Sequence, residues 1–173
     1  QGITTICPAS MTFSEERLNK IFAAAKEYKG ETGAELVGIN MEGPFISMEK
    51  KGAQNPEFIH KPDADMFYRL QEAAGGLVKL VDIAPECIEE INKDVRVSVA
   101  HTAADYDVAK KAFEKGARQV THLYNGMNPF HHREPGVVGA ACDNENVMVE
   151  LIVDGIHSHP ATVRTTFKMF GDD

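Results

Sequence analysis

The sequence predicts an α/β protein whose strands form a parallel (β/α)8 TIM-type barrel, present here as an incomplete barrel. Short runs rich in β-branched residues alternate with segments of helical period, which is the pattern of successive β-α units. Glu42, His101, His122 and His157 each lie at or just past the carboxyl end of a predicted strand. These ends converge on one mouth in a barrel but spread along an edge in an open doubly wound sheet. The number of polar strand ends therefore favours the barrel.

The strands are predicted from short apolar runs bounded by turn residues. Strands buried on both faces of a parallel sheet have this near-continuous apolar character. The predicted strands span 3–8, 36–41, 78–84, 95–100, 119–123 and 147–153. They are fewer than the eight that close such a barrel, so an incomplete barrel is expected.

The helices between the strands are predicted from apolar residues at helical spacing and from the residues at their ends. Ser14 is suited to an N-cap, and Leu18 and Phe22 lie on one face of the helix that follows. Gly116 and Gly171 are suited to helix ends. The predicted helices span 14–30, 63–74, 86–92, 105–115 and 160–170.

Composition limits the class of protein. The chain has 173 residues, of which 43% are hydrophobic, so one globular domain over residues 1–173 is expected. A net charge of -8 argues against broad binding to nucleic acid or to anionic membranes, since both require a concentrated basic surface. No apolar run approaches the roughly 18 residues of a membrane span.

The cysteines indicate a reducing compartment. Cys7, Cys87 and Cys142 are widely spaced, odd in number and without a CxxC pair, which is a poor disulfide framework. A cytoplasmic protein is therefore expected, with Cys7 and Cys142 as buried thiols.

Three of the strand-end residues have the chemistry of metal ligands. His101 ends VSVAHT and His122 ends QVTHL, one β-α unit apart, while Glu42 lies in NMEGPF. Two imidazoles and a carboxylate with a fourth position left to water form a catalytic zinc-type set. A single histidine at a strand end is more often a hydrogen-bonded structural residue, but three such positions at one mouth favour the metal.

Longer motifs carry a resemblance to a known family. NMEGPFIS followed by KKGAQ, SVAHT, THLYNGMNPFHHREPGVVGAA and VDGIH occur in this order. Together they resemble the N-acetylglucosamine-6-phosphate deacetylases of the amidohydrolase superfamily, over nearly the whole chain. The resemblance implies that the chain corresponds to about strands 2 to 7 of the barrel. The first and last strands and a flanking β-sandwich then lie outside residues 1–173.

The resemblance also implies an activity and a site. The activity is hydrolysis of N-acetylglucosamine 6-phosphate to glucosamine 6-phosphate and acetate, a step of amino-sugar catabolism. Glu42, His101 and His122 are the implied ligands of a divalent metal, with zinc expected first and iron, cobalt or manganese as alternatives. The implied substrate-binding residues are Ala53, Asn125, Gly126, Arg133 and His157. Arg133 is expected to meet the phosphate across the interface of a homodimer.

The sequence departs from the family pattern at three points. Asn40 and Gln54 stand where relatives commonly have histidine, and Gln54 remains a candidate contact to the acetyl carbonyl. The family's catalytic aspartate is expected beyond Asp173, so this chain alone is expected to be a poor catalyst. Another amidohydrolase and a non-catalytic sugar-phosphate-binding segment are the alternative interpretations. The HHREPG and VDGIH motifs argue against the first, and the intact ligand set argues against the second.

Overall fold

The strands form a parallel sheet in chain order. The computed structural model describes residues 2–30, 33–87 and 95–171. The sheet consists of β3 (Ile39–Glu42), β4 (Val78–Ile83), β5 (Arg96–Val99), β6 (Gln119–Val120) and β7 (Met148–Val149), each paired with the next. The order shows none of the reversal that defines a doubly wound sheet. The predicted incomplete barrel is therefore confirmed.

A second, two-stranded sheet stands beside the first. It pairs β1 (Thr5–Ile6) with β2 (Glu35–Leu36) in parallel. A bridge between Ala9 and Asn40 extends this pairing onto β3. The predicted strand 36–41 is thus two short strands, separated around Gly38. A Cβ built on Gly38 would lie 2.4 Å from Lys79 Cγ, so the backbone passes close to β4 at this break.

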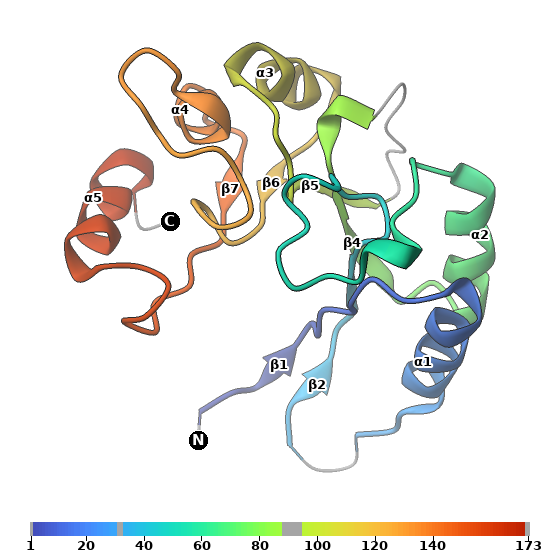
Figure 1. The fold of residues 1–173 in the computed structure, drawn as a ribbon. Coiled ribbons are helices and arrows are strands. Elements are labelled where there is room, and N and C mark those ends of the chain that lie inside the picture. Colours follow the sequence, from blue (N-terminus) through green and yellow to red (C-terminus); the bar gives the residue numbers. More distant parts are fainter. Residues whose placement is uncertain (1, 31–32, 88–94, 172–173) are drawn as a thin grey trace.

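Helices lie around the outer side of the sheet (Figure 1). They are α1 (Glu15–Glu27), α2 (Ala64–Ala73), α3 (Tyr106–Lys115), α4 (Gly136–Cys142) and α5 (Pro160–Phe170), with 3-10 turns η1 (Pro56–Phe58) and η2 (Pro85–Cys87). Four of the α-helices match predictions, but α4 was not predicted. The predicted helix 86–92 falls largely outside the described residues. Among the described helices, none combines the length and the apolar character needed to cross a bilayer.

Capping and burial explain why the predicted helices form. Ser14, Asp63 and Asp105 each accept a hydrogen bond from a backbone N–H in the first turn of α1, α2 and α3. Leu18 and Phe22 of α1 are fully buried in one core that also holds residues of α2 and the sheet. The buried faces of α1 and α2 thus pack into the same core as the sheet.

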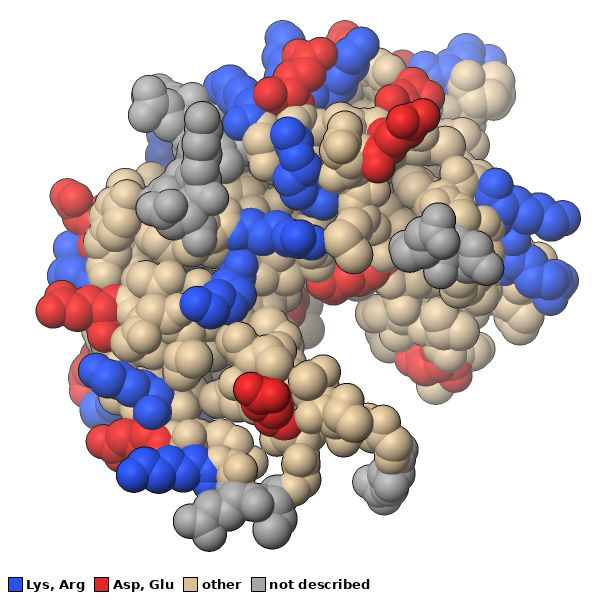
Figure 2. Space-filling model, turned by 180° about the vertical axis from the view of Figure 1, so that it is seen from behind, with Lys and Arg blue, Asp and Glu red and all other residues tan. Residues whose placement is uncertain are grey.

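The surface fits the composition, with one correction. On the face shown in Figure 2, basic and acidic side chains are interspersed over the molecule. Cys7 and Cys142 are exposed free thiols, so the expectation that they are buried was wrong. Cys7 belongs to the loop that follows β1, and Cys142 is the last residue of α4.

Candidate metal centre

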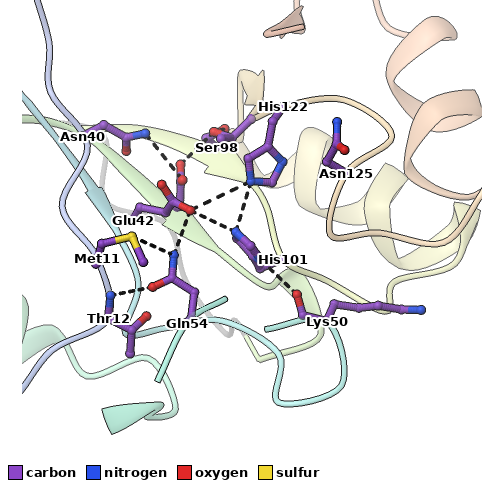
Figure 3. A network of polar contacts seen from close by, with 12 residues as sticks. Met11, Thr12, Asn40, Glu42, Lys50, Gln54, Ser98, His101, His122 and Asn125 are labelled. Atoms are coloured by element: carbon purple, nitrogen blue, oxygen red, sulfur yellow. Dashed lines mark hydrogen bonds and ion pairs between the residues drawn. The ribbon is translucent and has the colours of Figure 1, made fainter. Parts of the chain in front are cut away.

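Three side chains meet at the carboxyl ends of β3, β5 and β6 (Figure 3). Glu42 ends β3, while His101 and His122 each follow a strand by two residues. One ligand atom from each lies within 4.8 Å of the others. The Nε2 of His101 is 3.0 Å from Oε1 of Glu42 and 3.1 Å from Nε2 of His122. The structure therefore brings together the three residues that the sequence indicated as ligands.

The backbone turns sharply at both histidines. His101 has φ 44° and His122 has φ 34°, in the left-handed region that non-glycine residues rarely adopt. Each conformation costs on the order of 1–3 kcal/mol and persists only where surrounding contacts hold it. The turn leaves the strand direction and aims each imidazole at Glu42. Such strain at residues of this chemistry is typical of functional sites.

The orientation of His101 is fixed by a backbone carbonyl. Its Nδ1 lies 2.8 Å from the carbonyl oxygen of Lys50. A carbonyl oxygen only accepts, so Nδ1 carries a proton and donates, and Nε2 of the neutral ring presents its lone pair. A metal-binding histidine is commonly oriented by this kind of contact.

A glutamine holds Glu42 from the other side. Gln54 is 3% exposed, and its Nε2 donates to Oε1 of Glu42 at 2.9 Å. Its Oε1 accepts from the backbone N–H of Thr12 at 2.6 Å. A further contact of Nε2 runs to the thioether sulfur of Met11 at 3.8 Å. The predicted site residue Gln54 thus lies directly against Glu42.

The electrostatics of the ligands follow from burial and from one another. Burial is the largest single effect and opposes ionisation of Glu42, but the hydrogen bonds from His101 and Gln54 and the charges of His101 and His122 together outweigh it and lower the pKa of Glu42. Burial is likewise the largest single effect on His101 and opposes its protonation, but the hydrogen bonds to Glu42 and the Lys50 carbonyl and the charges of Glu42 and Asp82 together outweigh it and raise the pKa of His101. Burial and the nearby charge of His101 lower the pKa of His122, which favours its neutral form.

The donor set fits a divalent cation. If both imidazoles are neutral, the lone pairs of His101 and His122 and the carboxylate of Glu42 point into the same space. Three acceptors this close repel one another unless a cation or a proton lies between them. Within the described part of the chain, the buried Nδ1 of His122 has no hydrogen-bond partner. That nitrogen can carry the ring proton, which leaves the lone pair on Nε2. Two imidazoles and one carboxylate match sites for zinc and for related transition metals.

The turn after β6 brings two predicted substrate residues beside the ligands. The N–H of Asn125 donates to the carbonyl of His122 at 2.9 Å, and the carbonyl of Gly126 accepts from Thr102 at 3.0 Å. Gly126 has φ 61°, and a Cβ there would lie 2.9 Å from Nδ1 of His101. Only glycine fits this position without displacing the imidazole.

The remaining predicted residues lie apart from the three ligands. Arg133 is exposed, and its guanidinium contacts the ring of His132 at 3.2 Å. His157 is exposed and bonds through Nδ1 to Asp154 at 2.6 Å. Ala53 is exposed in the turn just before Gln54. Within the described part of the chain, no hydrogen bond or ion pair joins these three residues to Glu42, His101 or His122.

Asn40 belongs to a set of buried polar residues in the barrel interior whose other members sequence reasoning missed. These are Asp82, Ser98 and Thr121. Burial raises the pKa of Asp82 to about 8, against the opposing hydrogen bond from Thr121. The available signal was an aspartate within the otherwise apolar strand VKLVDI.

Comparisons with known proteins agree with this geometry. No family model matches the chain. It is 39% identical over 183 residues to N-acetylglucosamine-6-phosphate deacetylase of Bacillus subtilis (strain 168), which covers 99% of this chain and 46% of that protein. It is 35% identical to the enzyme of that name from Homo sapiens, over 96% of this chain and 44% of that protein.

Solved structures give the same result. One is a mutant of N-acetyl-D-glucosamine-6-phosphate deacetylase from Mycobacterium smegmatis in complex with N-acetyl-D-glucosamine-6-phosphate. It superposes on this chain with a TM-score of 0.89 at 34% identity, over 97% of this chain and 45% of that one. The deacetylase from Thermotoga maritima gives a TM-score of 0.84 at 31% identity, over 97% of this chain and 47% of that one.

The barrel segment, with Glu42, His101 and His122 at its mouth, has the arrangement expected of a chain of the amidohydrolase superfamily. Within it, the chain is homologous to the N-acetylglucosamine-6-phosphate deacetylases, as the motifs indicated. It spans less than half the length of the curated relatives described above.

Proposed function

We propose that this chain is the metal-binding part of an enzyme that hydrolyses N-acetylglucosamine 6-phosphate to glucosamine 6-phosphate and acetate. The observation that carries the proposal is the convergence of Glu42, His101 and His122 at the barrel mouth, in a chain homologous to enzymes named for this reaction. The bound sugar phosphate in the mycobacterial relative supports the same substrate.

Zinc is the proposed metal, with iron, cobalt or manganese as alternatives for the same donors. A divalent metal held here supplies a bound water of lowered pKa and polarises the amide carbonyl. Glu42, His101 and His122 hold it, and the Lys50 carbonyl keeps the proton of His101 on Nδ1. The carboxyl ends of parallel barrel strands are where such enzymes bind substrate, which supports this placement.

Asn125 and Gly126 are the proposed sugar contacts, since their turn packs against His101 and His122. Ala53 is proposed to line the same pocket. Arg133 and His157 are the proposed phosphate contacts, because a planar guanidinium offers paired donors and an imidazole can add another. Asp154 accepts from the backbone N–H groups of Ile156 and His157 and from the His157 ring, so it orients that imidazole.

Gln54 is proposed to contact the acetyl carbonyl. One of its amide hydrogens is bound to Glu42, and the other contact of the amide nitrogen is the weakly accepting sulfur of Met11. The amide hydrogen facing Met11 is therefore the one that a substrate carbonyl can take. A donor aimed at a developing oxyanion stabilises the transition state of amide hydrolysis.

We propose that the parent enzyme is a cytoplasmic homodimer. The exposure of Arg133 supports a role across a subunit interface, and the free thiols of Cys7 and Cys142 fit a reducing compartment. The family's catalytic aspartate is proposed to lie outside these residues, together with the first and last barrel strands and the β-sandwich. The chain alone is then expected to release acetate slowly or not at all.

The first test is metal content of the purified chain beside His122→Ala, with folding followed by circular dichroism. About one equivalent in the folded chain and none in the folded variant is the expected result. Binding of N-acetylglucosamine 6-phosphate is then compared with that of N-acetylglucosamine by calorimetry. Tighter binding of the phosphorylated sugar is expected, with loss of the difference in Arg133→Ala. Equal binding of both sugars would favour another amidohydrolase, and a folded chain without metal would contradict the proposed centre.

A further inference from the structure

A layer of buried polar side chains lies in the barrel interior beside the candidate metal centre. Asn40 comes from β3, Asp82 from β4 and Ser98 from β5, while Thr121 directly follows β6. Asp82 and Ser98 are 0% exposed. Barrel interiors are usually filled by branched apolar side chains, and burying a carboxyl group is costly without partners. The layer therefore calls for a physical reason.

Asp82 connects the members of this layer. Thr121 Oγ1 donates to Oδ1 of Asp82 at 2.8 Å, and Asn40 Nδ2 donates to Oδ2 at 3.4 Å. The hydroxyls of Ser98 and Thr121 lie 2.7 Å apart. Each carboxyl oxygen of Asp82 thus has a partner on a different strand.

The partners of Asp82 are close in sequence to the proposed ligands. Asn40 precedes Glu42 by two residues, so both side chains lie on the same face of β3 (Figure 3). Thr121 immediately precedes His122, whose backbone is strained. Glu42 and Asp82 are also register partners across β3 and β4. A strained ligand keeps its geometry only if neighbouring contacts fix the backbone beside it.

We propose that Asp82 is a positioning residue of the metal centre. It acts through Asn40 and Thr121 to hold the ends of β3 and β6, so that Glu42 and His122 stand at ligand distance. The inference rests on the proposed metal site. Under the alternative, the same contacts would contribute to stability without changing metal binding.

The test is Co²⁺ titration of the folded chain and of Asp82→Asn, followed by calorimetry and by the visible absorption of the bound ion. Asn keeps the size of the side chain but cannot accept at both positions. Loss of partners around a ligand typically weakens metal binding about 10- to 100-fold. We expect a loss of that size together with a changed Co²⁺ spectrum, which reports coordination geometry.

Thr166→Val is the matched control. Thr166 is also buried and bonds to Tyr124 at 2.9 Å, but it lies on α5 outside the layer. It should leave Co²⁺ affinity and spectrum unchanged. In the Asp82→Asn background, a further Asn40→Ala change should cost little additional affinity, because Asn40 acts through the same carboxyl group.

The outcomes separate the two proposals. A folded wild-type chain that binds no Co²⁺ overturns both the metal centre and this inference. Wild-type affinity and spectrum in folded Asp82→Asn overturn the inference alone. If Asp82→Asn does not fold, Asn40→Ala and Thr121→Val each remove one bond to Asp82 and must each weaken Co²⁺ binding. Unchanged affinity in either folded variant would equally overturn the inference.

Discussion

The chemistry of the site depends on where single residues place their protons. The Lys50 carbonyl fixes the proton of His101 on Nδ1, and Glu42 accepts from Gln54. His101 and His122 reach these positions through left-handed backbone conformations. Such conformations are set by tertiary contacts, so residue type and spacing could indicate the ligands but not how they are held.

Asp82 makes the stability of the metal-free chain depend on pH. Its pKa is raised from 3.8 to about 8, with burial as the main cause and with the charges of Glu42 and Glu150 adding to it. Between these values the unfolded chain is ionised at Asp82 and the folded chain is not, so the folded state binds more protons. The free energy of unfolding should therefore fall as pH rises from about 4 to 8, by on the order of 5 kcal/mol at most.

Urea unfolding across this pH range, with the metal removed, measures the effect. Asp82→Asn should flatten the profile, because its amide does not titrate. Glu150, whose pKa burial also raises, should leave a smaller slope of the same sign. A profile equally steep in Asp82→Asn would assign the pH dependence to other groups.

Gly126 tests how closely the turn after β6 fits His101. Gly126→Ala should destabilise the fold and weaken metal binding, because its Cβ would lie 2.9 Å from Nδ1 of His101. Gly155→Ala is the matched control, since Gly155 has φ 77° but nothing lies within 4 Å of its Cβ. In both variants the left-handed backbone conformation should lower the free energy of unfolding by about 1–2 kcal/mol. Urea unfolding measures the loss of stability, and Co²⁺ titration should show that only Gly126→Ala loses metal affinity. Equal Co²⁺ affinities in the two variants would mean that the turn moves freely.

At the scale of elements, local sequence signals determined most helices. α1, α2, α3 and α5 have side-chain caps and apolar faces, and the structure agrees with their predicted positions. α4 has neither a side-chain cap nor a polar face, and residues Gly136 to Ala141 are all buried. Its helicity comes from packing, which propensity could not indicate. The break between β2 and β3 likewise reflects the close approach of Gly38 to β4.

The cap of α3 supports the loop that follows His101. Asp105 accepts from the N–H of Val108 at 2.9 Å. Asp105→Ala should lower the free energy of unfolding by about 1 kcal/mol. Asp107→Ala removes a charge of the same first turn without removing the cap, and should cost only about 0.3 kcal/mol. Thermal unfolding of both variants measures the difference, and equal losses would assign the effect to charge alone.

At the scale of the whole molecule, topology explains which part of the site was predictable. Parallel strands in chain order bring their carboxyl ends to one mouth, so residues that end β3, β5 and β6 had to meet. Arg133 and His157 lie on loops, whose positions depend on contacts that no local pattern encodes. Those two residues stand apart from the ligands here. The layer around Asp82 was not predicted, because its hydrogen bonds join residues from different strands and no single strand of the sequence shows them.

The same topology predicts how metal binding affects the whole chain. Ligands from three strands would be joined by one ion, and an ion that binds only the folded state stabilises it by mass action. At about 100 times its dissociation constant, the ion adds about 2.7 kcal/mol, which corresponds to a rise in Tm of roughly 5–10 °C for a chain of this size. Circular dichroism melts of the chelator-treated chain with and without Co²⁺ measure the shift. His122→Ala should abolish it, whereas His60→Ala, an exposed histidine outside the three ligands, should preserve it. An equal shift in His122→Ala would place the ion elsewhere on the molecule.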